Sequence, residues 1–441
     1  MIRFLPLAFA SLLVTLFTHA PARADWPQFR GPDGQGHAEV TGLPLKWSES
    51  QNVAWKTPLP GRGWSSPVIE DGRIWMTAAI EEPISEEERK RRLEGLEGNV
   101  DSLALAGAVS LRVLCVDLES GKLLKDTEVL RVDEPEPVHT LNSYASPTPI
   151  VERGRLYCHF GTYGTICLDT QTHKVLWKNS ELNIDHQNGP GSSPILWGEL
   201  IIFHCDGMDL QYIAALDKQT GKLAWKTDRS GKMDEKPPLK KAYCTPLVVD
   251  SKQGPQLISP AADWLYSYDP ATGKELWRAG YGKLGFSTVP RPVAGHGMVY
   301  ICTSFMQSRL LAVRYDGQGD VTDTHVAWHS DRQIPKMPSP LLVGDELYVV
   351  SDSGIATCFD AHTGEELWRE RLGGNYSASP LLADGRIYFF SREGDTTVIR
   401  PGKQFELLAA NHLDGQFMAS AAIAGKGLIL RTDGHLYRIE D

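Results

Sequence analysis

One short phrase recurs along this chain and constrains its fold more than any other feature of the sequence. Its clearest copy, LYSYDPATGKELWR at 265–278, leads from an apolar stretch through an Asp-x-x-Thr-Gly turn to a tryptophan. The other copies are ALDKQTGKLAWK (215–226), CFDAHTGEELWR (358–369), CLDTQTHKVLWK (167–178) and CVDLESGKLLK (115–125), the last without the tryptophan. Apolar residues alternate on both arms of a turn that most copies centre on glycine, so each copy is predicted to form a β-hairpin.

A second signature, a small hydroxylated residue followed by proline, precedes an apolar strand at the start of each repeat unit. It occurs as Ser66-Pro67, Ser146-Pro147, Ser193-Pro194, Thr245-Pro246, Ser339-Pro340 and Ser379-Pro380, with Val289-Pro290 and Ser420-Ala421 as degenerate copies. With the strands that follow, each unit holds four strands in about 40–50 residues, which is typical of one propeller blade. A sandwich or two unrelated β domains would not repeat four elements in one order. The sequence therefore predicts an all-β fold, an eight-bladed β-propeller with four-stranded blades.

The two ends of the repeat array complement each other. The eighth unit stops within 436–441, on its third strand, and lacks the tryptophan arm. A lone hairpin arm, QNVAWKT at 51–57, precedes the first unit and has no partner arm of its own. We expect this arm to supply the missing fourth strand, because a shared blade would remove the exposed sheet edges. The propeller would then span 51–441, after an N-terminal leader at 25–50.

The first unit holds the one large insertion, at 81–109. Ser85 and Glu88 form a capping box, which predicts the start of a helix. Pairs of opposite charge four residues apart, Glu86–Lys90, Glu87–Arg91 and Glu88–Arg92, favour a solvated helix that continues to about Leu96.

The N-terminus has the pattern of an export signal. Arg3 supplies a positive start, the segment 4–17 is apolar, and Ala22-Arg23-Ala24 places small residues before a cleavage site. The apolar segment is shorter than the roughly 20 residues that a membrane-spanning helix needs. We therefore expect a cleaved signal peptide at 1–24 and a periplasmic or secreted protein. No cysteine follows the apolar segment, so lipid attachment is not expected.

The net charge limits the classes of partner that are expected, and the cysteine spacing limits the disulfides that could form. The formal net charge of −10 argues against a nucleic-acid surface, whose affinity comes mainly from neutralised phosphates. Of the seven cysteines, only Cys158 and Cys167 are placed so that they could pair, across a loop at 161–164. Direct cross-strand disulfides need an unusual geometry, so this bridge stays open.

The repeated phrase Asp-x-x-Thr-Gly-Lys/Glu-x-x-Trp resembles the repeat of the pyrroloquinoline-quinone-type (quinoprotein-like) eight-bladed propellers, over roughly 51–441. In that family the tryptophan packs against the neighbouring blade. The matching residues here are Trp55, Trp177, Trp225, Trp277, Trp328 and Trp368, and Lys125 replaces the tryptophan in one unit. The family contains quinone-dependent dehydrogenases of alcohols or sugars, which hold pyrroloquinoline quinone (PQQ) and usually calcium in the channel. It also contains non-enzymatic scaffolds such as BamB, and the repeat itself does not choose between the two classes.

The residues just before each unit's first strand would surround the channel mouth. Two positions before the hydroxylated residue stand Trp64, Tyr144, Gly191, Tyr243, Ser287, Met337, Ser377 and Met418. We select as candidate partner- or ligand-binding residues Arg62, Trp64, Tyr144, Lys241, Tyr243, Phe286, Met337, Tyr376, Phe417 and Met418. Aromatic, methionine and cationic side chains suit a protein segment or a flat ligand. The alternative is that these rings only pack the tops of the blades.

No motif in the sequence specifies catalysis or a metal. There is no adjacent cysteine pair and no haem-attachment motif. The aspartates of the loops are isolated and are expected to be solvated turn residues: Asp185, Asp206, Asp263, Asp352 and Asp414. His139, His186 and His412 are likewise isolated. We therefore predict no catalytic residue, no metal and no cofactor, with PQQ and calcium only under the alternative of a dehydrogenase.

These observations favour an exported, non-catalytic scaffold that resembles BamB and binds a protein or peptide, or another partner, in the cell envelope. The expected interaction surface is the channel mouth. The protein is expected to be a monomer, peripheral to a membrane at most, without nucleic-acid partners. The alternative function is a PQQ-dependent dehydrogenase of alcohols or sugars.

Overall fold

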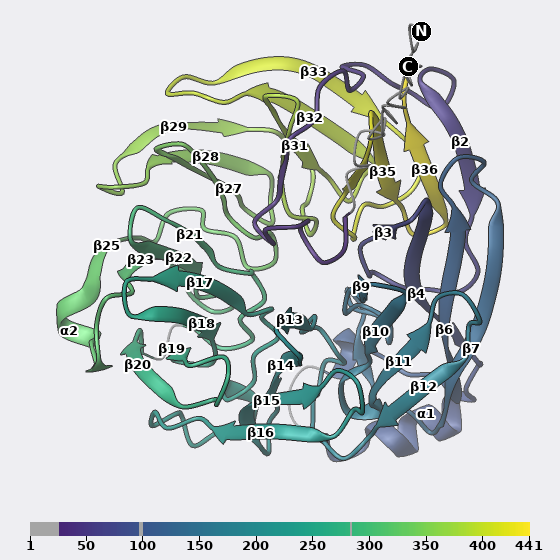
Figure 1. The fold of residues 1–441 in the computed structure, drawn as a ribbon, viewed down its shortest axis with the longest axis horizontal. Coiled ribbons are helices and arrows are strands. Elements are labelled where there is room, and N and C mark those ends of the chain that lie inside the picture. Colours follow the sequence, from purple (N-terminus) through teal and green to yellow (C-terminus); the bar gives the residue numbers. More distant parts are fainter. Residues whose placement is uncertain (1–25, 97–99, 283–284) are drawn as a thin grey trace, which may run out of the picture.

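The structure, a computed structural model, describes residues 26–96, 100–282 and 285–441 and forms a β-propeller of eight blades in a ring (Figure 1). The predicted signal peptide at 1–24 lies outside the described residues. Each blade is an antiparallel sheet of four strands, which confirms the predicted fold and repeat unit. The hydrophobic cores lie largely between neighbouring blades, where the apolar residues of one sheet pack on the next.

The first four blades follow one another along the chain. Blade 1 comprises β3 (Val68–Glu70), β4 (Arg73–Glu81), β6 (Ala108–Asp117) and β7 (Leu123–Asp133). Blade 2 comprises β9 (Ile150–Glu152), β10 (Arg155–His159), β11 (Thr165–Asp169) and β12 (Val175–Asn179). Blade 3 comprises β13 (Ile195–Trp197), β14 (Leu200–Asp206), β15 (Gln211–Asp217) and β16 (Leu223–Asp228). Blade 4 comprises β17 (Leu247–Ser251), β18 (Gly254–Pro260), β19 (Trp264–Tyr268) and β20 (Glu275–Gly280).

The remaining blades complete the ring. Blade 5 comprises β21 (Val293–Gly295), β22 (Met298–Cys302), β23 (Leu310–Arg314) and β25 (Val326–Ser330). Blade 6 comprises β26 (Leu341–Val343), β27 (Glu346–Val350), β28 (Ile355–Asp360) and β29 (Glu366–Arg371). Blade 7 comprises β30 (Leu381–Ala383), β31 (Arg386–Phe390), β32 (Asp395–Arg400) and β33 (Glu406–His412). Blade 8 comprises β34 (Ala422–Ala424), β35 (Gly427–Arg431), β36 (His435–Ile439) and β2 (Val53–Pro58).

Short elements lie between or beside the blades. The additional strands are β1 (His37–Ala38), β5 (Leu103–Ala104), β8 (Val138–His139) and β24 (Gly319–Asp320). The helical elements are α1 (Glu86–Leu93), α2 (Thr322–His325), η1 (Val100–Ser102), η2 (Gly161–Tyr163) and η3 (Pro237–Leu239). Within the described residues, no helix is both long and apolar enough to cross a membrane.

Blade 8 is shared between the two ends of the chain, as predicted. Strand β2 runs antiparallel to β36, and the register pairs Val53 with Ile439 and Pro58 with His435. This pairing gives hydrogen-bond partners to the backbone groups on the outer edge of β36 and closes the ring.

In most blades, the tryptophan of the repeat joins the blade to the next one. The indole nitrogens of Trp55, Trp177, Trp225, Trp328 and Trp368 donate to a backbone carbonyl in the following blade, at 2.9–3.2 Å. The turn glycine packs directly against the indole of the preceding blade. A Cβ atom on Gly221, which has φ +71°, would lie 2.4 Å from the side chain of Trp177. Trp277 also packs between two blades, but its indole donates to Gln256 Oε1 of its own blade, at 2.7 Å. The predicted inter-blade packing of the tryptophan is thus confirmed.

The junction of blades 1 and 2 lacks both halves of this contact. Blade 1 carries Lys125 where six of the other blades carry the tryptophan, and the turn of blade 2 carries His173 where most others carry glycine. The φ of His173 is +58°, and its ring lies 5.5 Å from the ring of Trp75. The loss of the tryptophan and the loss of the glycine therefore occur together, because without an indole the turn can hold a side chain.

The insertion of blade 1 forms a helix that is shorter than predicted. The Ser85 hydroxyl accepts a hydrogen bond from the Glu88 amide at 3.2 Å, which confirms the serine half of the predicted capping box, while the Glu88 carboxylate accepts from Arg91. The helix ends at Leu93 rather than near Leu96, because Glu94 has extended backbone angles. Arg91 pairs with Glu88, three residues away, rather than with Glu87 as the spacing predicted.

The cysteine pair considered from the sequence does not form a disulfide. In the β10–β11 hairpin, Cys158 lies opposite Ile166 and Cys167 lies opposite Tyr157, so the two cysteines are displaced by one residue. The connecting loop contains the short helix η2. All seven cysteines are free thiols in buried positions.

Candidate binding pocket in the central channel

A belt of hydroxyl groups surrounds the channel where the inner strands begin. The hydroxyl of one blade accepts a hydrogen bond from the backbone N–H of the blade before it. The pairs are Ser66 to Thr148, Thr148 to Ser193, Ser193 to Thr245, Arg291 to Ser339, Ser339 to Ser379, Ser379 to Ser420 and Ser420 to Ser66, at 2.9–3.1 Å. Between blades 4 and 5 the belt is interrupted, because Arg291 occupies the position of the hydroxylated residue. The belt explains why seven of the eight units carry serine or threonine at this position.

The belt also corrects the register of two units. In blade 2 the equivalent position is Thr148, not Ser146, and in blade 5 it is Arg291, not Val289. Both units contain two prolines spaced two residues apart, and the sequence alone favoured the first. Because of this shift, Ser146 and Val289 are the pocket residues that correspond to Trp64.

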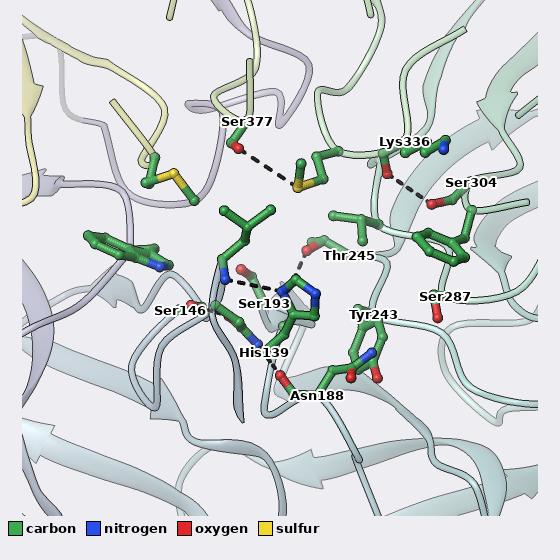
Figure 2. Close-up of a pocket in the computed structure, with 18 of the residues that line it drawn as sticks. His139, Ser146, Asn188, Ser193, Tyr243, Thr245, Ser287, Ser304, Lys336 and Ser377 are labelled. Carbon is green, nitrogen blue, oxygen red and sulfur yellow. Dashed lines mark hydrogen bonds between the residues drawn. The ribbon is translucent and has the colours of Figure 1, made fainter. Parts of the chain in front are cut away.

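A cavity of about 590 Å³ lies above the belt. Figure 2 shows His139, Tyr243, Lys336 and Ser377 around one central space, contributed by different parts of the ring. Six of the ten predicted residues line it: Trp64, Lys241, Tyr243, Phe286, Met337 and Met418. Residues that the sequence reasoning missed include Phe29, His139, Phe305 and Lys336. Phe29 comes from the leader, and His139 and Phe305 come from loops away from the Ser-Pro signature. Lys336 directly precedes Met337, but only aromatic residues were selected at that repeat position.

The other four predicted residues lie outside the lining of the cavity. Tyr144, Tyr376 and Phe417 are almost fully buried, and Phe417 packs edge-on against Phe390. These three rings pack the blades, as the alternative interpretation held. Arg62 lies over the Trp64 ring at 5.2 Å and donates to the Thr140 carbonyl at 2.7 Å, so it supports a pocket residue from outside.

The leader forms the floor of this cavity. Trp26 exchanges backbone hydrogen bonds with Ile69 at the far end of the inner strand of blade 1. Gln35 Oε1 accepts from the Ala294 amide of blade 5 at 2.6 Å, and β1 pairs in parallel with β30 of blade 7. The leader therefore crosses the far end of the channel, where Figure 1 shows the purple chain over the central opening. Phe29 of this segment lines the cavity, so the pocket is closed on that side.

The pocket combines an apolar lining with a few charged groups. The Lys241 side chain is buried and its ammonium contacts Gln187 Oε1; burial lowers the pKa of Lys241 to about 8. The Lys336 ammonium lies 5.2 Å from the centre of the Phe305 ring. Asp352 was expected to be a solvated turn residue, but its Oδ2 accepts from the Lys336 amide at 2.7 Å, and burial raises its pKa.

The lining does not fit a calcium–quinone centre. Calcium takes six to eight oxygen ligands and prefers carboxylates. Among the described residues that line the pocket, Asp352 is the sole carboxylate. The belt hydroxyls already accept hydrogen bonds from backbone amides. With one carboxylate and the amide oxygens of Asn142, Gln187 and Asn188, of which Gln187 Oε1 already contacts Lys241, the lining is a poor donor set for PQQ with calcium.

A buried ion pair supports the wall of the pocket between blades 3 and 4. Asp206, predicted to be solvated, is only 1% exposed because it lies inside the ring. Both of its carboxylate oxygens accept from Arg229, at 2.9 and 2.6 Å, and Arg229 also donates to Ser259 at 2.7 Å. The Asp206 backbone bridges to Ala242, which stands between Lys241 and Tyr243 of the lining.

His186 gives the wall a dependence on pH. Its carbonyl accepts from the Tyr243 hydroxyl at 2.6 Å, and its Nε2 accepts from the Thr162 amide at 3.1 Å. Burial lowers the pKa of His186 to about 4, against a smaller opposite effect of Asp209. In the unfolded chain a histidine has a pKa of about 6.5, so its neutral form is favoured by folding. This stabilisation is complete above about pH 6.5 and is lost as the pH falls toward 4.

We expect the difference in unfolding free energy between wild type and His186→Gln to shrink on acidification. The unfolded wild type gains a proton that the folded wild type does not, which costs about 2 kcal/mol at about pH 5. Urea unfolding at about pH 7.5 and about pH 5 measures this change. His329→Gln, at an exposed histidine, is the control. A difference that stays constant with pH would contradict the neutral, buried state of His186.

The comparisons with known proteins agree with this architecture. The family described as outer membrane protein assembly factor BamB matches residues 89–227, 210–343 and 261–417, which together cover more than half of the chain. No curated protein matches the sequence.

Solved structures of two functional classes share the fold. BamB from Moraxella catarrhalis is 14% identical, with a TM-score of 0.52, and the match covers 83% of this chain and 99% of that one. Quinohemoprotein alcohol dehydrogenase from Comamonas testosteroni is also 14% identical, with a TM-score of 0.51 and coverage of 94% and 80%. The computationally designed protein Ika8 is 11% identical, with a TM-score of 0.57 and coverage of 87% and 98%. Because these identities are low, the similarity concerns the fold, while the family match across the repeats shows that the chain belongs to the BamB family of PQQ-type β-propellers.

Proposed function

We propose that this protein is an exported, non-catalytic scaffold whose pocket receives a short segment of a partner protein. The observation that carries the proposal is the pocket itself: it is closed by the leader, mostly apolar and open at the face of the inter-blade loops. Its lining holds one carboxylate and no group that pairs a nucleophile with a base, among the residues described. Such a pocket is suited to binding rather than to acid–base chemistry.

The rim extends the apolar surface beyond the cavity. Phe305 and Met306 are 53% and 66% exposed, and Leu141 is also exposed. Phe286 meets Phe305 edge-on at 5.6 Å, which holds one aromatic ring in the pocket and the other at its rim. Exposed apolar patches of this kind mark protein–protein contacts, and methionine and aromatic residues are enriched at their cores.

The charges at the pocket favour an acidic segment. The chain has a net charge of −10, yet the lining carries two lysines, Lys241 and Lys336, against the one aspartate, Asp352. Lysines beside an apolar pocket attract a carboxylate that flanks an apolar anchor. We therefore expect the partner segment to place an aromatic or aliphatic side chain in the cavity and an acidic group beside the lysines. Export is supported by the signal-like segment at 1–24 and by the outer-membrane role in the family's description.

Selection from a display library of random peptides tests this proposal. We expect enriched peptides to combine an apolar residue with an acidic neighbour, and to bind the full-length protein. Met337→Asp should weaken this binding by about tenfold or more, because it places a charge in the apolar wall. Leu407→Asp, at an exposed position of β33 on the outer side of blade 7, is the matched control.

A second measurement distinguishes the alternative function. The protein is titrated with PQQ and calcium, while the melting temperature and dye-linked oxidation of alcohols and sugars are followed. We expect neither a shift nor turnover, because the donor set is poor. A large upward shift together with turnover would overturn the scaffold proposal.

A further inference from the structure

Three potential metal ligands meet on the face opposite the pocket, at the junction of blades 5 and 6. His296 lies in the β21–β22 turn of blade 5, Asp345 in the β26–β27 turn of blade 6, and His362 in the Asp-x-x-Thr-Gly turn of blade 6. The Nε2 atoms of His296 and His362 lie 3.2 and 3.1 Å from the same oxygen, Oδ1 of Asp345. One ligand atom from each of the three residues lies within 4.8 Å of the others.

The surroundings orient the two imidazoles. Nδ1 of His296 lies 3.2 Å from the hydroxyl of Tyr300, so Nε2 is the nitrogen that faces Asp345. The backbone amide of His362 donates to Asp360 Oδ1 at 3.0 Å, which fixes the turn that carries it. The two rings are 4.2 Å apart. A hydrogen-bonded partner on the far nitrogen of a ligating histidine is a common feature of protein metal sites.

The corresponding turns of blade 3 give a comparison within the molecule. Glu199 occupies the position of Asp345, and Gln219 occupies the position of His362. These side chains also touch, with Gln219 Nε2 at 3.3 Å from Glu199 Oε2. Contact between the two turns is thus ordinary in this fold. The junction of blades 5 and 6 differs because imidazoles from two blades point at one carboxylate.

We propose that His296, Asp345 and His362 form a zinc site that joins blades 5 and 6. Two imidazoles and one carboxylate are a ligand set that zinc accepts in tetrahedral geometry, with water in the fourth position. Imidazole ligands also suit nickel and copper, whereas magnesium and calcium prefer oxygen ligands. Because the ligands come from two blades, the ion would add a crosslink to the junction where Trp328 already donates to Ala361.

Metal binding by the full-length protein, without a polyhistidine tag, tests the site. We expect calorimetric titration with zinc chloride to give one zinc per chain and the melting temperature to rise. Cobalt, used as a spectroscopic substitute, should give the strong visible bands of a tetrahedral site. His296→Gln and His362→Gln should each weaken zinc binding by more than the roughly tenfold loss expected for Tyr300→Phe, because each removes a ligand rather than a group that orients one.

Two controls keep the result interpretable. Glu199→Gln alters the equivalent turn of blade 3 and should leave zinc binding unchanged. In chelator, the two histidine variants should melt close to the wild-type temperature, because the His362 side chain is 50% exposed and glutamine keeps a hydrogen-bonding group at the 23% exposed side chain of His296. Equal zinc binding by wild type and by the double variant His296→Gln/His362→Gln would overturn the proposal, as would loss of zinc binding in Glu199→Gln.

Discussion

Deleting residues 51–57 is expected to unfold the whole ring, not just blade 8. The deletion removes most of β2, so β36 loses its outer partner and becomes an exposed edge. It also removes the contacts of Trp55 with the Leu118 carbonyl and Gly121 of blade 1. The deletion therefore removes the β2–β36 pairing and the tryptophan contact between blades 8 and 1 at the same time. The combined cost is comparable with the whole stability of a typical domain, about 5–15 kcal/mol.

Circular dichroism melting and size-exclusion chromatography measure this result. The truncated protein should lack a cooperative transition or melt far below the wild type. A synthetic peptide of residues 51–58, added to the truncated protein, should restore part of the transition by pairing with β36. Trp55→Ala, which keeps the strand, should lower the melting temperature by a smaller amount. An unchanged melting temperature after the deletion would show that the shared blade does not hold the ring closed.

Asp206→Ala is expected to give a large loss of stability for a single substitution. It leaves the Arg229 guanidinium buried without its carboxylate partner, which typically costs about 3–5 kcal/mol. The double variant Asp206→Leu/Arg229→Met removes both charges and should be clearly more stable than Asp206→Ala. Urea unfolding of the three proteins measures the coupling.

An exposed ion pair provides the control for this prediction. Glu366 pairs with Arg369 on β29, where both side chains reach solvent. Glu366→Ala should cost less than about 1 kcal/mol, because water screens the pair and replaces its hydrogen bonds. If Asp206→Ala cost no more than Glu366→Ala, the buried pair would not be an important support of blades 3 and 4.

The architecture could be predicted from the sequence because its main determinants are local. The alternation of apolar residues, the Asp-x-x-Thr-Gly turn and the tryptophan lie within single hairpins, and each recurs along the chain. Closure followed from counting strands, since the arm at 51–57 and the third strand near 436–441 each lacked a partner. The register of Thr148 and of Arg291 could not be determined this way. Two prolines compete in each of those units, and only the hydroxyl belt between blades distinguishes them.

The pocket was predictable only where its residues adjoin the Ser-Pro signature. Trp64, Tyr243 and Met337 stand at one repeat position, so periodicity located them. Phe29 reaches the cavity because the leader crosses the ring, and no repeat signals that path. The same holds for His296 and His362, which are 66 positions apart in sequence number and meet only because blades 5 and 6 are neighbours. Ring closure and blade stacking bring together residues that are far apart in the chain, so no local sequence pattern predicts these contacts.

The hydroxyl belt has a consequence for what the pocket can accept. Each serine or threonine ties the entry of its inner strand to the blade beside it, so at seven of the eight junctions the blades cannot separate independently at this level. The width of the cavity is therefore set before any partner arrives, and little backbone ordering remains to oppose association. Under the proposed function, we therefore expect size to limit which partner segments the cavity admits. Selectivity in such a ring would change through the side chains that project above the belt, while the belt itself stays the same.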